Sequence, residues 1–236
     1  MLLPDLRKRV LDANLELQRQ GLVLYTFGNA SGIDRSAGLI AIKPSGVPYE
    51  RLKAEDLVIT DLEGRIVEGT LNPSSDLDTH VLLYREFPTI GGVVHTHSEF
   101  ATSWAQAQMP IPCFGTTHAD YFNGEVPVTE PLTDEQIEGE YEKNTGAVIV
   151  HRFKGLDPEA VPGVLVAGHA PFTWGKSPEA AAHTAVILEY LAKLAFRANL
   201  LRPELGPVSP ALLRRHYERK HGANATYGQR TPEEKH

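Results

Sequence analysis

The sequence has almost no cysteine and no excess of positive charge. Cys113 is the single cysteine among 236 residues, which excludes an intramolecular disulfide framework and a zinc site built from several thiolates. Lys and Arg number 23 against 30 for Asp and Glu, giving a formal net charge of -7. An acidic chain has no overall field that attracts nucleic acid or an anionic membrane, so we expect neither partner. Any anionic ligand must be bound by local groups.

Long apolar stretches are also missing. The longest one, residues 185–201, contains Glu189, Lys193 and Arg197, and three charges make it a poor membrane span. The first ten residues contain charged side chains where a secretory signal needs an apolar segment. We therefore expect a cytoplasmic protein.

Periodicity and turn residues predict both helices and strands. Apolar residues three to four apart indicate helices, and short apolar or β-branched runs between turn residues indicate strands. The expected helices cover residues 4–20, 76–87, 98–108, 133–143, 178–200 and 210–220. The expected strands cover residues 23–27, 39–42, 57–60, 92–96, 147–150 and 164–167. Thr133, Ser177 and Ser209 are expected to cap the helices that follow them. No repeat or flexible linker interrupts the chain, so we expect a single α/β domain with helices covering a mainly β core.

Three histidines suggest a metal site. His95 and His97 come at the end of the expected strand 92–96, where side chains two residues apart point to the same side. His169 follows the expected strand 164–167. Three neutral imidazoles with an open fourth position form the usual catalytic zinc arrangement, in which the ion polarises an oxygen of water or substrate. A surface pair of histidines is the alternative, and the third histidine disfavours it.

Two polar loops suit a phosphate group. Ser74, Ser75 and Asp76 lie where a helix is expected to begin, and the free N–H groups and the helix dipole there favour an anion. The turn over residues 43–46 offers the cation of Lys43, a hydroxyl group and a glycine that allows close approach. Plain helix capping is the alternative for the first loop. Asp76 could also provide an oxygen ligand to the metal.

Other polar groupings are less informative on their own. Residues 28–32 are small and turn-forming, so we expect an ordinary loop there. His118 and Asp120 place an imidazole two residues from a carboxylate, and this arrangement is as typical of a capped turn as of a functional pair. The basic segment 216–221 has the composition of a solvent-exposed helix face. Four further histidines without a partner pattern are expected to be structural or exposed: His80, His151, His183 and His236.

In their order along the chain, these motifs resemble the class II aldolase family, and within it the branch that epimerises L-ribulose 5-phosphate. The resemblance is carried by residues 28–29, 43–46, 74–76, 95–97, 116–121, 168–169 and 227–229. It extends over nearly the whole chain, although Phe27 stands where this branch has Trp. The resemblance implies a single catalytic domain over residues 1–229 with a central, mainly antiparallel β-sheet covered by helices. Residues 230–236 would form a disordered tail.

The resemblance also implies a role for each candidate residue. The metal ligands would be Asp76, His95, His97 and His169, holding one Zn²⁺ per chain, with Mn²⁺ or another divalent cation as the alternative. The substrate contacts would be Gly28, Asn29, Lys43, Ser45, Gly46, Ser74, Ser75, Thr116, Glu142, His216 and Arg219. Asp120 and Tyr227 would act as the catalytic acid and base. A homotetramer with active sites between chains is implied as well.

The implied reaction agrees with such a site. Carbon 4 of a 2-ketopentose is not adjacent to the carbonyl group, so removing its hydrogen gives no enolate. Cleaving the bond between carbons 3 and 4 and re-forming it on the other face converts L-ribulose 5-phosphate to D-xylulose 5-phosphate. This route needs a Lewis acid, a phosphate anchor and two acid/base groups.

Three alternatives stay open. A class II sugar-phosphate aldolase would use the same metal and phosphate sites but release its aldehyde product. A metal-free scaffold, as in the head domain of adducin, would share only the fold, and the three histidines weigh against it. A zinc hydratase would leave the phosphate loops without a role.

Overall fold

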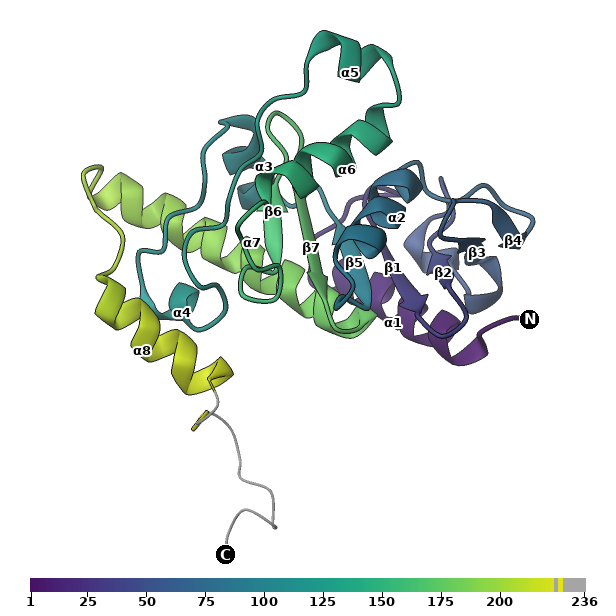
Figure 1. Ribbon diagram of the computed structural model, residues 1–236, viewed down its shortest axis with the longest axis horizontal. Coiled ribbons are helices and arrows are strands. Elements are labelled where there is room, and N and C mark those ends of the chain that lie inside the picture. The colour runs from purple at the N-terminus through teal and green to yellow at the C-terminus, as the bar shows by residue number, and fades with distance from the viewer. Residues whose placement is uncertain (223–224, 227–236) are drawn as a thin grey trace, which may run out of the picture.

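A seven-stranded antiparallel sheet lies at the centre of the computed structural model, which describes residues 1–222 and 225–226 (Figure 1). The strands are β1 (Asn29–Asp34), β2 (Leu39–Ile42), β3 (Val58–Asp61), β4 (Ile66–Glu68), β5 (Gly92–His95), β6 (Gly163–Leu165) and β7 (Pro171–Gly175). Their order in the sheet is β4-β3-β2-β1-β5-β7-β6, and every neighbouring pair is antiparallel. The predicted α/β fold with a mainly antiparallel sheet is confirmed.

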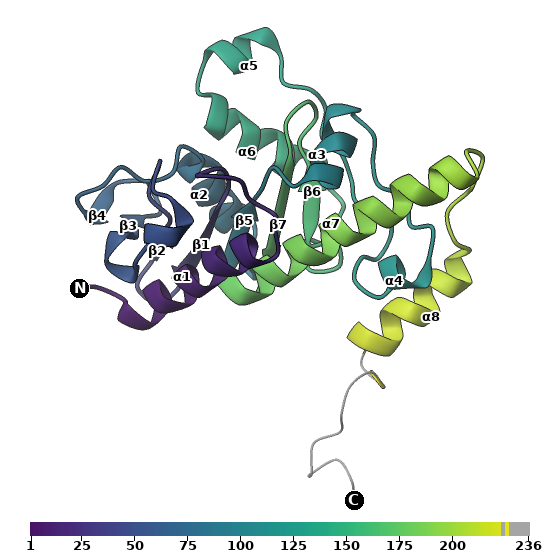
Figure 2. The same ribbon diagram turned by 180° about the vertical axis from the view of Figure 1, so that it is seen from behind.

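Helices cover both faces of this sheet. The α-helices of the described residues are α1 (Pro4–Arg19), α2 (Leu77–Glu86), α3 (Glu99–Gln106), α4 (Thr116–Ala119), α5 (Asp134–Glu138), α6 (Tyr141–Arg152), α7 (Pro178–Leu201) and α8 (Pro210–His221). Helices α2 and α6 pack together on one face, in front in Figure 1, and α1 and α7 lie across the other, in front in Figure 2. Helix α8 packs on α4, beyond the sheet. Within the residues described, no helix has both the length and the apolarity needed to cross a bilayer.

The apolar core therefore has two layers. Val81 and Tyr84 of α2 belong to a buried cluster with Trp174 of β7. On the other face, Leu17 of α1 and Ala185 of α7 belong to a second cluster with Val94 of β5. All four residues of β5 are buried, as expected for a central strand with both faces covered.

Polar caps begin three helices where the sequence predicts them. The hydroxyl of Ser177 accepts from the backbone N–H of Ala180 at 3.2 Å, and that of Ser209 from Leu212 at 3.3 Å. Thr133 exchanges two bonds with Gln136, the reciprocal pattern of a capping box.

Three local expectations were wrong. Residues 23–27 form turns instead of a strand, with Tyr25 at a φ of 53°. Residues 28–32 are not an ordinary loop, because most of them belong to the central strand β1. Their small size has a packing reason, since a Cβ on Gly32 would lie 2.5 Å from Cγ of Pro178 in α7. Residues 147–150 lie inside α6 instead of forming a strand, because a short apolar run has no period that separates the two structures.

One helix and two strands also differ from the sequence prediction. The predicted helix 133–143 is divided between α5 and α6, with Gly139 and Glu140 between them. Strands β4 and β7 had no counterpart in the sequence prediction. Tyr227 and the expected tail 230–236 lie outside the described residues.

Candidate metal and phosphate site

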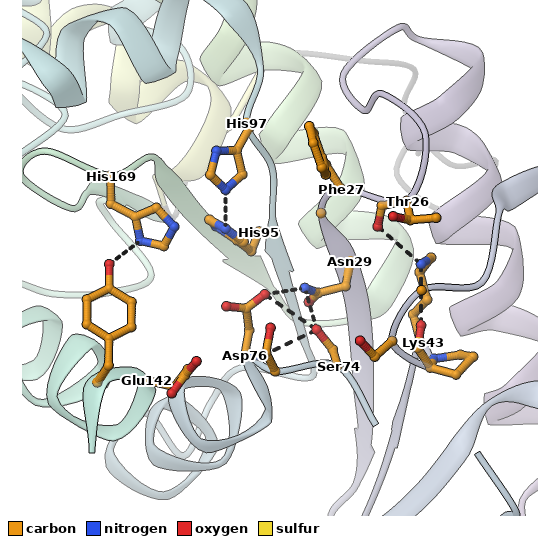
Figure 3. A pocket seen from close by; sticks show the side chains of 16 residues that line it. Thr26, Phe27, Asn29, Lys43, Ser74, Asp76, His95, His97, Glu142 and His169 are labelled. Atoms are coloured by element: carbon orange, nitrogen blue, oxygen red, sulfur yellow. Dashed lines mark hydrogen bonds between the residues drawn. The ribbon is translucent and has the colours of Figure 1, made fainter. Parts of the chain in front are cut away.

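One cavity of about 360 Å³ gathers most of the predicted site residues (Figure 3). It lies where β1 begins and β5 ends, beside the N-terminal ends of α2 and α6. The predicted residues that line it are Gly28, Asn29, Lys43, Ser45, Gly46, Ser74, Ser75, Asp76, His95, His97, Glu142 and His169. Segments from distant parts of the chain therefore meet in one pocket.

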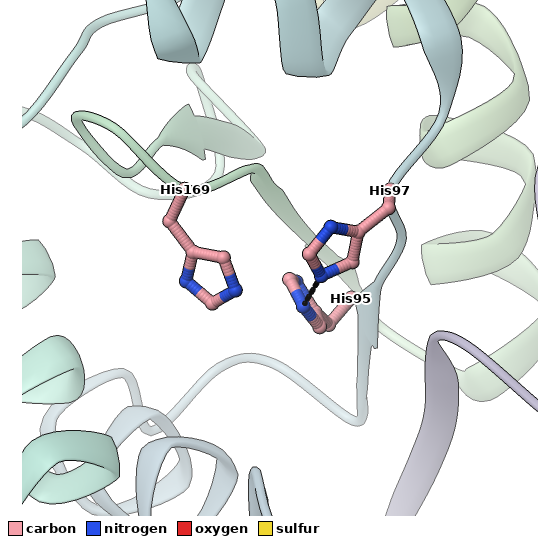
Figure 4. A group of neighbouring side chains, drawn as sticks. All are labelled: His95, His97 and His169. Carbon is pink, nitrogen blue, oxygen red and sulfur yellow. Dashed lines mark hydrogen bonds between the residues drawn. The ribbon is translucent and has the colours of Figure 1, made fainter.

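The three histidines predicted as metal ligands lie together at one side of this cavity (Figure 4). One ring nitrogen from each of His95, His97 and His169 lies within 4.8 Å of the others. Nε2 of His95 is 3.1 Å from Nε2 of His97. His95 ends β5, His97 follows it by two residues, and His169 lies in the turn between β6 and β7.

The neighbouring strand β7 fixes the orientation of His95. Nδ1 of His95 is 3.0 Å from the carbonyl oxygen of Pro171, so this nitrogen carries the proton and donates it. Phe172 is the register partner of His95, and the two rings stack with centroids 4.2 Å apart. Nε2 of His95 therefore carries the lone pair, which faces the other two imidazoles, as metal binding requires.

Burial keeps two of these imidazoles, those of His97 and His169, in the form that binds a metal. Burial lowers the pKa of His97, and it lowers the pKa of His169 to about 4. Neutral imidazole is the ligand form, and a donor set of three imidazole nitrogens with a nearby carboxylate suits a divalent cation of the zinc type. The residues present thus fit the metal that the resemblance implies.

Asp76 lies between the histidines and the polar loops (Figure 3). It is the residue before α2, but its side chain makes no capping bond. Its carboxylate instead accepts from Nδ2 of Asn29 at 2.6 Å and from Oγ of Ser74 at 3.4 Å. Burial alone would raise the pKa of Asp76, but the imidazoles of His95 and His80 and the Asn29 bond together hold it below its ordinary value. An ionised carboxylate therefore faces the three histidines.

The two predicted phosphate loops are joined to each other. The N–H of Ser45 donates to the carbonyl of Asn72, and the N–H of Ser74 donates to the carbonyl of Lys43, both at 3.0 Å. Asn29 of β1 ties this wall to the sheet by donating to Oγ of Ser74 at 2.9 Å. The loops thus form one continuous side of the cavity, opposite the histidines in Figure 3.

Lys43 supplies the positive charge of that wall. Its side chain is 1% exposed, and Nζ lies 3.4 Å from the carbonyl oxygens of Thr26 and Pro44 and 4.8 Å from the centre of the Tyr49 ring. Burial lowers its pKa to about 8. No carboxylate in the described part of the chain forms an ion pair with it. A buried cation with only carbonyl and aromatic neighbours suits an anionic ligand.

The remaining predicted residues form a separate cluster on α4 and α8. Asp120 accepts from Nδ1 of His216 at 3.0 Å and from Nε and an Nη of Arg219 at 3.0 and 2.8 Å. Burial alone would raise the pKa of Asp120, but these bonds outweigh it and hold the pKa below its ordinary value. Thr116 begins α4, and none of these four residues lines the cavity. The expected catalytic Tyr227 lies outside the described residues.

Sequence reasoning missed three residues that line the cavity, Thr26, Phe27 and Tyr141, whereas Pro44 lies in the predicted turn 43–46. Phe27 is 56% exposed, and its ring centroid lies 6.3 Å from that of His97. The hydroxyl of Tyr141 is 3.5 Å from Nδ1 of His169. Their position next to predicted site residues could have identified two of them, because Phe27 precedes Gly28 and Tyr141 precedes Glu142.

Comparisons with known proteins agree with one another. The family model of the class II aldolase and adducin N-terminal domain matches residues 8–196. The chain is 52% identical to L-ribulose-5-phosphate 4-epimerase UlaF of Salmonella paratyphi C (strain RKS4594) over 95% of this chain and 99% of that protein. It is 51% identical to the protein of the same name from Salmonella typhi, with the same coverage.

Solved structures resemble the fold over most of the chain. An L-fuculose 1-phosphate aldolase aligns with a TM-score of 0.77 at 26% identity, covering 91% of this chain and 95% of that one. The L-fuculose-1-phosphate aldolase of Thermus thermophilus aligns with a TM-score of 0.65 at 26% identity, covering 86% of this chain and 98% of that one.

Proposed function

The chain belongs to the class II aldolase and adducin N-terminal domain family, and we propose that it is an L-ribulose-5-phosphate 4-epimerase. The observation that carries the proposal is the single cavity in which three imidazoles and a carboxylate face two joined polar loops with a buried lysine. The names of relatives at about half identity over nearly the full chain support the same activity.

The reaction we propose is epimerisation by cleavage and re-formation of a carbon–carbon bond. Carbon 4 of L-ribulose 5-phosphate lies two atoms from the keto group, so its hydrogen is not acidified. Removing the proton of the carbon 4 hydroxyl group and breaking the bond between carbons 3 and 4 leaves two fragments. Carbons 1 to 3 keep the electron pair as the enediolate of dihydroxyacetone, and carbons 4 and 5 become glycolaldehyde phosphate, whose carbonyl group can turn over and react on its other face. Re-forming the bond then yields D-xylulose 5-phosphate, provided that the fragment stays bound.

The metal we propose is one Zn²⁺ per chain, held by His95, His97 and His169 with Asp76 alongside. When bound, such a cation supplies a Lewis acid for the keto and adjacent hydroxyl oxygens and for the charge that develops on cleavage. The protein prepares this site by keeping the imidazoles of His97 and His169 neutral through burial and by fixing the His95 tautomer through the Pro171 carbonyl. The class II aldolases of this family are metal-dependent, and the identity of the ion is part of the proposal.

The joined loops would hold the substrate phosphate. Lys43 provides charge, Ser45, Ser74 and Ser75 provide hydroxyl groups, and Gly46 allows close approach of the backbone. The remaining pocket contacts in the proposal are Gly28, Asn29 and Glu142. This anchor keeps the aldehyde fragment beside the metal site while its carbonyl group rotates.

The acid and base in the proposal are Asp120 and Tyr227, with Thr116, His216 and Arg219 as further substrate contacts. Asp120 and its partners line no part of this chain's own cavity, which supports completion of the site by a neighbouring copy in a homotetramer. The catalytic domain would then extend over residues 1–229, with residues 230–236 as a tail. Cytoplasmic location belongs to the same proposal and is supported by the single cysteine.

A second candidate is a sugar-phosphate aldolase that releases its aldehyde. It is favoured by the fold similarity to an L-fuculose 1-phosphate aldolase at a TM-score of 0.77. An aldolase would accept L-fuculose 1-phosphate and produce free lactaldehyde.

A coupled assay separates these activities. The purified chain is loaded with Zn²⁺ and given L-ribulose 5-phosphate or L-fuculose 1-phosphate in parallel. We expect D-xylulose 5-phosphate from the first substrate and little free aldehyde from either. Rapid release of lactaldehyde would favour the aldolase. Failure of the chain to bind Zn²⁺, together with inactivity on both substrates, would favour an adducin-like scaffold.

A further inference from the structure

A buried tyrosine lies behind the phosphate side of the cavity. Tyr49 begins the one-turn 3₁₀ helix η1 (Tyr49–Arg51) and is 1% exposed. It belongs to the apolar cluster that also contains Leu17 of α1 and Val94 of β5. The core therefore fixes the position of its ring. Tyr49 is not among the residues that line the cavity, and no sequence motif singled it out.

The ring of Tyr49 faces the ammonium group of Lys43. Nζ of Lys43 lies 4.8 Å from the ring centre, a distance at which the negative face of an aromatic ring attracts a cation. Nζ also donates to the carbonyl oxygens of Thr26 and Pro44, but both distances are 3.4 Å, longer than an ordinary hydrogen bond (Figure 3). The ring therefore supports a buried cation that its carbonyl neighbours hold only loosely.

The hydroxyl group of Tyr49 holds the chain segment that Lys43 contacts. It donates to the carbonyl oxygens of Phe27 and Gly28, both at 2.9 Å, so the two share its one hydrogen. Burial raises the pKa of Tyr49, so this hydroxyl keeps its proton. The preceding residue, Thr26, supplies one of the two carbonyl groups that Lys43 contacts. One buried side chain thus holds both the cation and part of its surroundings.

We propose that Tyr49 is a positioning residue for the phosphate side of the cavity. Its ring supports the Lys43 ammonium group where that group meets an anionic ligand, and its hydroxyl fixes residues 26–28 beside it. Lys43 lines the cavity, and a side chain that is already held in place loses less freedom when it binds a phosphate. The inference rests on the phosphate site of the proposed function and adds a residue behind the cavity wall.

Binding of inorganic phosphate is the first test, measured by titration calorimetry on the full chain loaded with Zn²⁺ and freed of unbound metal. Tyr49→Leu removes the aromatic face, and we expect phosphate affinity to fall about 3- to 30-fold, the range of a desolvated cation–π contact. Tyr49→Phe keeps the ring and should weaken binding less. Tyr84→Leu is the control: Tyr84 is a fully buried tyrosine of α2 in the other core layer, and we expect unchanged phosphate affinity.

The second test asks whether the effect of Tyr49 passes through Lys43. Lys43→Met should weaken phosphate binding about tenfold or more, because a charged hydrogen bond is lost. In that background, Tyr49→Leu should weaken binding less than about twofold further. A general loosening of the fold would instead have its full effect in both backgrounds. Zn²⁺ content, measured alongside, should stay unchanged in the Tyr49 variants.

A third variant removes the electrostatic contact but keeps an aromatic ring. Fluorine atoms withdraw negative charge from the ring face, so the chain with pentafluorophenylalanine at position 49 should bind phosphate about threefold or more weakly than Tyr49→Phe. This pair of variants carries the test if Tyr49→Leu does not fold. Equal phosphate affinity in the pair would overturn the inference.

The outcomes separate this inference from the proposed function. Unchanged affinity in Tyr49→Leu, or full additivity with Lys43→Met, would overturn only the role of Tyr49. Failure of the unaltered chain to bind phosphate, or unchanged binding in Lys43→Met, would overturn the phosphate site and this inference with it. The expected pattern of phosphate affinities without epimerase activity would overturn the proposed reaction and support the role of Tyr49.

Discussion

Asp76 and Ser75 are neighbours in sequence with different surroundings. The Asp76 carboxylate is largely enclosed and bonded by Asn29, whereas Ser75 is exposed at the wall of the cavity. A buried charge beside three imidazoles interacts strongly with a divalent ion. A hydroxyl group at the rim offers one neutral hydrogen bond.

The two residues should therefore respond differently to substitution. Asp76→Asn is expected to lower Zn²⁺ content or affinity about 10- to 100-fold. Ser75→Ala is expected to raise KM several-fold with metal content unchanged, since a neutral hydrogen bond contributes about 1 kcal/mol. Metal analysis and steady-state kinetics measure both. Equal increases in KM with full metal content in both variants would mean that Asp76 belongs to the phosphate loop.

At the residue scale the sequence predicts much of the cavity. Motifs such as His95 with His97 are local, because the two residues are two apart at the end of one strand, where side chains of that spacing point to the same side. The cluster of Asp120 with His216 and Arg219 was not predictable, since those residues are about 100 positions apart and meet only when α8 packs on α4. The burial of His80 gave no signal either, because its hydrogen bond with Ser31 is made across the interface of α2 and β1.

At the scale of elements, the contact between α2 and α6 sets one side of the cavity. Helix α6 begins with Tyr141 and Glu142, which line the pocket. The Thr79 hydroxyl donates to the Glu142 carbonyl at 2.5 Å. Farther along, a Cβ on Gly146 would lie 3.0 Å from Cδ2 of Leu82 and 3.3 Å from Cα of Thr79. The two helices thus touch at a residue without a side chain.

Gly146→Val should push α6 away from α2. We expect a loss of about 1–3 kcal/mol in the free energy of unfolding, as is typical of overpacking, and a higher KM with unchanged metal content. Ala147→Val adds the same side chain at the next, exposed position of α6 and controls for the helix propensity of valine. Equal free energies of unfolding for the two variants would show that the contact between α2 and α6 leaves enough space for a valine side chain at position 146.

Elements with clear local signals were predicted, and elements defined by packing were not. Helices α7 and α8 begin at Ser-Pro pairs, and both appear with bounds close to those expected. Strand β1 was missed because its small residues do not form the alternating or β-branched pattern that indicates a strand. Their size instead allows the close approach of Pro178. The run 147–150 was misassigned because Ile149 is its one fully buried residue, so the burial follows a helix.

At the scale of the whole molecule, buried histidines should make stability depend on pH. Burial lowers the pKa of His118 and His169 to about 4 and that of His80 to about 3, whereas an unfolded histidine titrates near 6.5. The unfolded chain therefore binds more protons between these values. The contribution of these groups is complete above about pH 6.5 and is lost as the pH falls toward 4.

Urea unfolding of the metal-free protein between about pH 7.5 and 5 measures this effect. We expect the free energy of unfolding to fall with pH by up to about 1.4 kcal/mol per pH unit for each buried histidine. His118→Gln should reduce the slope, since His118 lies outside the cavity and its removal takes away one such group. A stability that stays flat over this range would contradict the burial of these rings.

Assembly is the second prediction at this scale. If a neighbouring copy supplies Asp120, then Asp120→Asn and His97→Asn should each be nearly inactive alone. Mixing them under subunit exchange should restore part of the activity, because some interfaces would join two intact halves. Mass spectrometry of differently labelled chains verifies exchange. Demonstrated exchange without recovery would mean that each chain builds a complete site.

The fate of the hydrogen on carbon 4 tests the proposed reaction most directly. The enzyme converts L-ribulose 5-phosphate in deuterium oxide, and the D-xylulose 5-phosphate is examined by NMR. Cleavage between carbons 3 and 4 never removes the carbon 4 hydrogen, so we predict product without deuterium at that carbon. Deuterium at carbon 4, or no D-xylulose 5-phosphate from the metal-loaded enzyme, would contradict the account.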